Sequence, residues 1–290
     1  MTASQDANHL GEGRLGQLRT IGKGRPASLA TVGWHRVVLE LKTFFRNRES
    51  VIFTFAFPIM ILVLFGAIFS GRVGSTAVDF RQYLVAGIMA SGLVSVSFST
   101  LATGISLEQG DGTLKRLAGT PMPKAAYFIG KLGMVLVVGL AEVAVTLGIG
   151  ALAYGLHLPD TPAKWFTFAW VCLLGISACS LMGIAYTRVI RNPKAASAVV
   201  TPPFIALQFI SGVYFVFSEL PKWLQTVASF FPLKWIAQGL RSVFLPESFA
   251  LTESARSWEH GRTALVLGAW CVAAFVMSVR WFRWRAREDG

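Results

Sequence analysis

Six long stretches without charged side chains, apart from one glutamate, constrain this sequence most, and each is flanked by charged residues. A helix needs about 20 apolar residues to cross the hydrocarbon core of a bilayer. Backbone polar groups cannot stay unpaired in hydrocarbon, so such stretches fold as helices. We therefore predict an all-α membrane protein with six transmembrane helices. The stretches lie between Glu49 and Arg72, Arg81 and Glu108, about 132 and 156, Lys164 and Arg188, Lys194 and Glu219, and Arg262 and Arg280.

Lysine and arginine are concentrated in alternate segments between these stretches. The formal net charge of +12 would by itself also suit a nucleic-acid-binding protein. With a cytoplasmic N-terminus, however, 19 of the 27 lysines and arginines fall on the cytoplasmic side. This asymmetry is typical of membrane proteins. We therefore expect both termini in the cytoplasm of a multi-pass inner-membrane protein, with the lipid bilayer and not nucleic acid as its surroundings.

A segment before the first stretch has helical periodicity. Its apolar residues are Trp34, Val37, Val38, Leu41, Phe44 and Phe45, and its polar residues are His35, Arg36, Glu40, Lys42 and Arg46. The spacing predicts an amphipathic helix on the cytoplasmic membrane surface, with the polar residues on the opposite face. Such a helix is either a membrane anchor or a lever that joins the first span to a cytosolic partner.

A second amphipathic segment precedes the last stretch. Its helical positions are Leu220, Trp223, Leu224, Val227, Phe230 and Phe231. Pro221 suits a helix start, and Pro232 breaks the chain before a short apolar run at 233–245. We expect two short re-entrant helices in the outer leaflet. They form either a structural cap or an external gate with Trp223, Leu224, Phe231 and Pro232.

The segment 108–124 has the pattern of a very short helix. Asp111 can cap its start, Leu114 and Leu117 share one face, and Pro121 prevents continuation. A tight turn between spans needs nothing so elaborate. A helix of about two turns with one apolar and one basic face fits a groove of another protein, and a solvated loop is the alternative.

This segment also resembles a known family. Glu-x-x-x-Gly-Thr-Leu-Lys-x-Leu from Glu108, followed by Thr120-Pro121 and Gly130-Lys131, is similar to the inner-loop signature of ABC type-2 permeases, the group that contains the daunorubicin-exporter membrane subunits. The Phe44-Phe45-Arg46-Asn47-Arg48 ending of the surface helix and the outer Pro-Lys-Trp-Leu and Phe-Pro-Leu-Lys-Trp segments agree. The likeness covers a transmembrane domain at 31–290 and leaves out residues 1–30, which we expect to be a disordered tail.

The resemblance implies specific roles. The short helix would be the coupling helix received by a separate ATPase subunit, through Glu108, Asp111, Gly112, Thr113, Leu114, Lys115, Arg116 and Leu117. The surface helix would be the connecting helix beside it, with Arg36, Glu40, Phe44, Phe45 and Arg46. Two permease copies would join two ATPases and export an amphipathic drug or a lipid-like molecule, and export of a lipid or a glycoconjugate is the alternative. The sequence departs from the family at Gln109-Gly110-Asp111, where a more continuous acidic run is common.

The sequence lacks the residue patterns that several kinds of chemistry require. No phosphate-binding loop occurs, so ATP and Mg²⁺ would bind the partner ATPase. We expect this chain itself to bind no cofactor. The four histidines lie outside the apolar stretches without metal-ligand spacing, so we expect no metal site. A lipid-modifying enzyme would need a polar cluster at one depth, and an ion-driven carrier several intramembrane charges. We expect a transporter subunit without catalytic residues.

Glu142 is the one charged residue inside an apolar stretch, in the third of the six. A carboxyl group in the bilayer is costly and by default suggests function. It either bonds a Ser or Thr of an adjacent span or contacts a cationic or hydroxyl-bearing cargo. Pro202 and Pro203 must kink the fifth span, either to widen a passage or only for packing. Glu142, Pro202 and Pro203 are thus the candidates for a substrate pathway.

Overall fold

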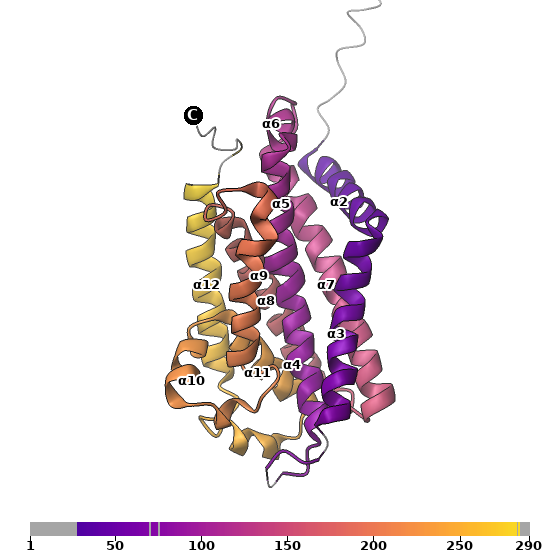
Figure 1. The fold of residues 1–290 in the computed structure, drawn as a ribbon, viewed down its shortest axis with the longest axis vertical. Coiled ribbons are helices and arrows are strands. Elements are labelled where there is room, and N and C mark those ends of the chain that lie inside the picture. The colour runs from indigo at the N-terminus through magenta and orange to yellow at the C-terminus, as the bar shows by residue number, and fades with distance from the viewer. Residues whose placement is uncertain (1–27, 70, 75, 283, 285–290) are drawn as a thin grey trace, which may run out of the picture.

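The computed structural model describes residues 28–69, 71–74, 76–282 and 284, and these form an elongated bundle of helices (Figure 1). The predicted helical fold class is confirmed. The helical elements in chain order are α2 Leu29–Arg46, α3 Arg48–Ile68, α4 Phe80–Val94, η1 Ser95–Thr100, α5 Leu101–Gly110, α6 Thr113–Ala118, α7 Lys124–Tyr154, α8 Pro162–Tyr186, η2 Pro193–Ala195, α9 Ala196–Ile210, η3 Phe217–Glu219, α10 Lys222–Ser229, α11 Pro232–Phe244, η4 Glu247–Thr252 and α12 His260–Trp281.

Five helices of the described chain are long and apolar enough to cross a membrane. They are α3, the continuous run Phe80–Gly110, α7, α8 and α12. They coincide with five of the six stretches predicted from the sequence. Most of α3 is exposed, with only Leu62 and Gly66 buried, as expected for a helix that faces lipid or another apolar partner.

The predicted fifth span is shorter than its apolar stretch. Helix α9 has 15 residues, which corresponds to about 22 Å at 1.5 Å per residue, against a hydrocarbon core of about 30 Å. The helix ends at Ile210 because Gly212 takes the left-handed conformation, with φ 76°. The following residues up to Val216 are mostly buried at the end of the bundle. The apolar stretch therefore overestimates the length of the helix, because the last part of the stretch has no regular helical structure.

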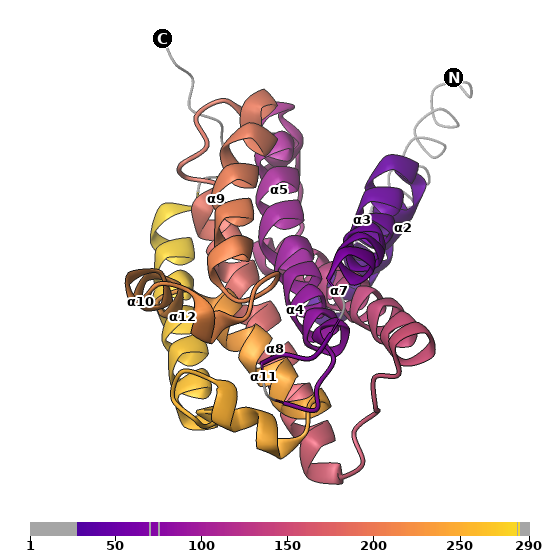
Figure 2. The ribbon, with the colours of Figure 1, turned by 60° about the horizontal axis from the view of Figure 1, so that its bottom comes forward.

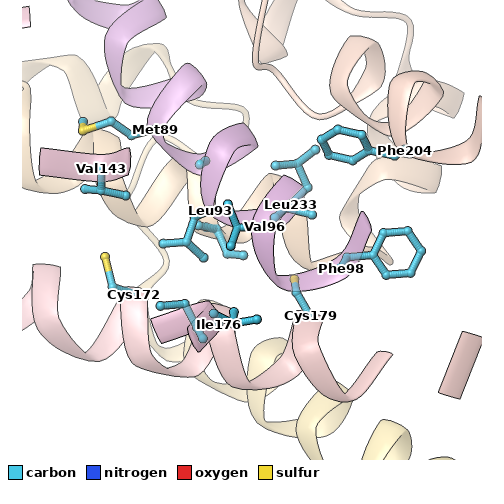
Figure 3. Close-up of a cluster of buried hydrophobic side chains, with 14 of the residues drawn as sticks. Met89, Leu93, Val96, Phe98, Val143, Cys172, Ile176, Cys179, Phe204 and Leu233 are labelled. Atoms are coloured by element: carbon cyan, nitrogen blue, oxygen red, sulfur yellow. The ribbon is translucent and has the colours of Figure 1, made fainter. Parts of the chain in front are cut away.

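The run α4–η1–α5 forms the centre of the bundle. Every residue of α4 from Tyr83 to Val94 is buried. In Figure 3, Leu93 and Val96 of this run face Cys172 and Ile176 of α8 in a tightly packed apolar cluster. The element η1 is a π-helix, whose wider turn brings backbone oxygens close to α8. Gly183 permits this approach, because a Cβ there would lie 2.9 Å from the carbonyl oxygen of Phe98.

The two ends of the bundle differ. Helix α6, the start of α3 and the end of α12 lie at one end, which we call the α6 end (Figure 1). Helices α10 and α11 lie at the opposite end, the α11 end (Figures 1 and 2). Of the tail predicted at 1–30, residues 1–27 lie outside the described residues. Leu29 and Ala30 belong to α2, whose start Ser28 caps by accepting a hydrogen bond from the Thr31 N–H at 3.2 Å.

Candidate functional site

A tight turn joins α5 to α6. Gly112 has φ 75°, a left-handed conformation that glycine adopts without strain. Asp111 Oδ1 accepts a hydrogen bond from the Thr113 N–H at 2.9 Å, although Gly112 and not Asp111 occupies the N-cap position of α6. Hydrogen bonds from Thr113 and the nearby Arg116 hold the pKa of Asp111 below its usual value. The carboxylate is therefore charged at the helix start, where it is favourable.

Helix α6 has one apolar and one basic face as predicted, but its apolar face packs against its own chain. Leu114 is fully buried against the bundle, and Leu117 packs against the same core. Lys115, Arg116 and Ala118 are exposed. The apolar side of this short helix fastens it to its own chain, so Leu114 is closed off from direct contact with a partner. The surface that α6 offers outward is basic.

Helix α2 is present as predicted, but one of its charged residues is buried. Its buried residues are Gly33, Val37, Glu40 and Phe44. Trp34 is 66% exposed and Phe45 51% exposed. The face that packs on the bundle therefore includes Glu40, which the periodicity placed on the polar side. The periodicity did not reveal this contact, in which a buried ion pair makes a charged residue part of the packing face.

Two glycines of α7 let α2 approach closely. A Cβ at Gly130 would overlap the side chain of Arg36, and one at Gly133 would overlap Val37. The two glycines are three residues apart and lie on one face of the helix. The close approach brings Arg36 and Glu40 of α2 next to polar residues of α7.

A buried network of charges joins α2, α5 and α7. Lys131 Nζ lies 2.8 Å from Glu40 Oε2 and 2.5 Å from Glu108 Oε1. The Tyr127 hydroxyl donates to Glu108 Oε2 at 2.6 Å. Arg36 NH2 lies 2.6 Å from Glu40 Oε1. Three helices are thus tied together directly below the α5–α6 turn.

The network balances two cations against two carboxylates. Lys131 is 4% exposed and Glu40 6% exposed, so both charges are removed from water. Such charges are tolerated only when they are paired and hydrogen-bonded. The sequence predicted Arg36, Glu40 and Glu108 as parts of two separate helices and missed Lys131 and Tyr127 as their partners. Positions 127 and 131 share one helix face, but their partners are remote in the chain.

At the α11 end, α11 is inserted into the bundle, with all of its residues buried. Arg241, which is fully buried, has its Nε 2.8 Å from Glu253 Oε1 and donates from NH1 to the Gly212 carbonyl at 3.1 Å. Its guanidinium lies 4.7 Å from the ring centroid of Tyr83. The Tyr83 hydroxyl in turn bonds Gly212 and Phe215 carbonyls, each at 3.1 Å. These bonds join α11 to the chain after α9 and to the start of α4.

The residues predicted to form an external gate divide into two groups. Pro232 begins α11 and is buried, and Pro221 precedes α10, both as predicted from the sequence. Trp223 is 66% exposed, whereas Leu224 and Phe231 are partly buried. The two helices predicted there are present, but only α10 has an exposed apolar side.

Glu142 is 1% exposed and lies against Gly92 of α4. Its Oε1 accepts a hydrogen bond at 3.1 Å from Thr146, on the next turn of its own helix and not on an adjacent span. Among the described residues, its Oε2 has no hydrogen-bond partner. Glu142 therefore packs inside the bundle with one carboxylate oxygen unpaired, and its contact with cargo stays a prediction.

Exchanging Glu142 for glutamine tests that role. We expect Glu142→Gln to retain the fold and to lower or keep transport equally for all cargoes, because the isostere keeps the packing against Gly92. Gly92→Ala should destabilise by about 1–3 kcal/mol through overpacking, and Glu142→Ala should restore most of that loss. Thermal unfolding and cargo competition measure both effects. A selective change for one cargo in Glu142→Gln would instead identify a cargo contact.

A small groove opens between α3, α4 and α9. Its volume is about 40 Å³, and its polar lining includes Thr54, Ser91, Ser95 and Gln208. Tyr214 also lines it and donates its hydroxyl to Gln208. The remaining lining is apolar and comes mostly from α3, with smaller contributions from α4 and α9.

The two prolines of α9 do not face this groove. Pro202 and Pro203 are exposed on the outer side of α9, away from Phe204 and Gln208, which are buried. The structure thus separates the three residues predicted for a substrate pathway: Glu142 is buried inside the bundle, and both prolines lie on its surface.

Comparison with known proteins agrees with these features. The family model described as ABC-2 type transporter matches residues 35–245. The inner membrane transport permease YadH of Escherichia coli K12 is 22% identical over 65% of this chain and 74% of its own. Nodulation protein J of Rhizobium leguminosarum bv. viciae is 25% identical over 75% of this chain and 82% of its own. The putative transport permease ycf38 of Porphyra purpurea is 25% identical over 68% of this chain and 68% of its own.

The matched region runs from α2 to the end of α11 and includes the charge network, the α5–α6 turn and the α3/α4/α9 groove. Together with the five apolar helices, it identifies a multi-pass inner-membrane transport permease and not an enzyme. The chain belongs to the ABC-2 type transporter family.

Proposed function

We propose that this protein is the membrane-spanning subunit of an ATP-driven exporter, which moves an amphipathic drug or lipid-like molecule outward. A separate ATPase subunit binds and hydrolyses ATP with Mg²⁺. The observation that carries the proposal is the α5–α6 turn at one end of the bundle, with a basic outer surface and a buried charge network beneath it.

In this account the α6 end is cytoplasmic and the chain crosses the membrane six times. The path of the chain supports this, because α3 begins and α12 ends at the same end of the bundle (Figure 1). An even number of crossings follows, and α9 supplies the sixth although it is short. The distribution of lysine and arginine favours the same orientation.

Force from the ATPase would enter through α6 and reach two further helices through the network. Lys131 bonds carboxylates of α2 and α5 at once, so a displacement of α5 must move α2 and α7 with it. Interfaces of this kind transmit small shifts because packed elements move as units. Arg36, Glu40 and Glu108 therefore act inside the permease, and the exposed residues of α6 contact the ATPase.

The groove between α3, α4 and α9 is the candidate path for cargo. Its walls combine apolar side chains with the hydroxyl and amide groups of Ser91, Ser95 and Gln208, and its volume of about 40 Å³ means that the path must widen to admit a drug-sized molecule. The α3 side exposes large apolar residues such as Phe53, which is 71% exposed. We propose that a second copy of the permease covers this side, so that two copies enclose the path and join two ATPases.

Reversing the charge of the outer α6 surface tests where the ATPase binds. We expect Lys115→Glu with Arg116→Glu to reduce co-purification of the ATPase by at least about tenfold, which corresponds to roughly 1.4 kcal/mol. Both side chains are exposed, and Arg116 also donates to Thr113 Oγ1 at 3.0 Å, so we expect the permease to stay folded and to lose no more than about 1.5 kcal/mol of stability.

Lys164→Glu, at the start of α8 and on the far end of the bundle, is the matched control and should bind the ATPase normally. Normal ATPase binding by the double α6 variant would refute this contact surface. Leu114→Asp is not diagnostic, because a charge at this buried position is expected to disturb the bundle itself.

A further inference from the structure

A depression at the α11 end lies between α10, α11 and the start of α12. Its volume is about 500 Å³, and the helices that line it lie at the opposite end of the bundle from α6 (Figure 1). Four charged residues line it, namely Lys222, Lys234, Glu259 and Arg262. Three cations therefore face one carboxylate.

Lys234 lies at the floor of the depression and is 3% exposed. Its Nζ lies 3.4 Å from the ring centroid of Trp235 and 5.3 Å from that of Phe217. The nearest carboxylate oxygen in the described chain, Glu259 Oε2, is 3.7 Å away, which is beyond hydrogen-bond length. An ammonium group has three donors, so this buried cation has hydrogen-bonding capacity to spare.

Glu259 is shared between Lys234 and other partners. Its Oε1 pairs with Arg262 NH1 at 2.5 Å, and its Oε2 also lies 3.5 Å from Gln238 Nε2. The next carboxylate, Glu253, pairs with Arg241 at 2.8 Å. The charges around Lys234 therefore leave an excess of positive charge facing the depression.

We propose that this depression binds a phosphate-type anion, held by the Lys234 ammonium at its floor and by Lys222 and Arg262 at its rim. Lys222 is exposed, and the side chain of Arg262 is 73% exposed, so both reach a ligand from the open side. The anion is either the headgroup of an anionic phospholipid or a soluble phosphate. The site does not depend on ATP-driven export.

Burial lowers the pKa of Lys234 to about 8, against the opposing effect of Glu259 and Glu253, while Arg241 lowers it further. A bound anion stabilises the ammonium form and raises this pKa. At neutral pH the neutral amine is the reactive form, so an increase of one unit lowers acylation of Lys234 about tenfold. The reactivity of Lys234 thus reports occupancy of the depression.

The test uses the purified full-length chain in nanodiscs, treated briefly with a water-soluble acetylating reagent at neutral pH and analysed by mass spectrometry. Nanodiscs of phosphatidylcholine are compared with nanodiscs that also contain phosphatidylglycerol, and inorganic phosphate is compared with sodium chloride of equal ionic strength. Lys164, which is partly exposed, is the internal reference.

We expect acetylation of Lys234 relative to Lys164 to fall several-fold and up to about tenfold with one of the two probes. Protection by phosphatidylglycerol identifies a lipid headgroup, and protection by phosphate identifies a soluble anion. Lys222→Gln with Arg262→Gln should abolish the protection, whereas Glu259→Gln should strengthen it. Absence of protection with both probes, or undiminished protection in the Lys222/Arg262 double variant, would overturn the proposal.

Discussion

Replacing Lys131 by methionine is expected to destabilise the protein by about 3–5 kcal/mol, because the buried Glu40 and the partly buried Glu108 then lose their shared cation. Glu40 and Glu108 both depend on Lys131, at 2.8 and 2.5 Å. Arg36 can still pair with Glu40, so the unpaired charge is mainly that of Glu108. Thermal unfolding in detergent and limited proteolysis near α6 measure the loss.

Two further variants separate charge from packing. Lys42→Met removes an exposed lysine of the same α2 and should change stability by no more than about 0.5 kcal/mol. Adding Glu108→Gln to Lys131→Met removes the unpaired carboxylate and should recover most of the stability. If Lys131→Met alone were as stable as Lys42→Met, the network would not hold α2, α5 and α7 together.

The repaired double variant also tests transmission. The double variant should fold and bind the ATPase. It should nevertheless move less cargo per ATP hydrolysed, because the ion pair between α5 and α7 is gone. Full coupling in this variant would show that the network has only a structural role.

The second large effect is expected at the opposite end. Arg241→Met should cost about 3–5 kcal/mol, since Glu253 then loses a fully buried partner and the Gly212 carbonyl loses a donor. Adding Glu253→Gln should recover part of this loss. Arg256 is exposed and lies three residues after Glu253, so Arg256→Met is the matched control and should hardly change stability.

Unfolding temperature and protease cleavage around α11 report this effect. Cleavage should rise near α11 and η4 but not near α6, because the two buried charge clusters lie at opposite ends of the bundle. Equal cleavage at both ends would contradict the local anchoring of α11. An unchanged unfolding temperature in Arg241→Met would contradict the contribution of the pair.

Local chemistry made much of the fold predictable. Charged boundaries located five long helices, Pro221 and Pro232 marked the starts of α10 and α11, and Asp111 marked the α5–α6 turn. Each signal acts within a few residues of the position that it specifies. The left-handed turn at Gly212 also ends α9, but it lies within a stretch without charged residues, which concealed it.

The inner contacts could not be predicted in the same way. Helical periodicity placed Glu40 on the polar face of α2, opposite the face expected to lie on the membrane, and could not show that Glu40 packs on the bundle. The pairing of Glu40 with Lys131, 91 positions later, depends on tertiary packing at Gly130 and Gly133. Leu114 was likewise assigned to a partner's groove, although the protein's own core receives it.

The most direct test of the account is transport into inverted membrane vesicles that contain this permease and its co-purifying ATPase. The account predicts ATP-dependent accumulation of an amphipathic drug or fluorescent lipid, lost when the phosphate-loop lysine of the ATPase is replaced and strongly reduced by Lys115→Glu with Arg116→Glu. Accumulation that persists without ATP, or that is unchanged in the α6 variant, would contradict an exporter driven through α6.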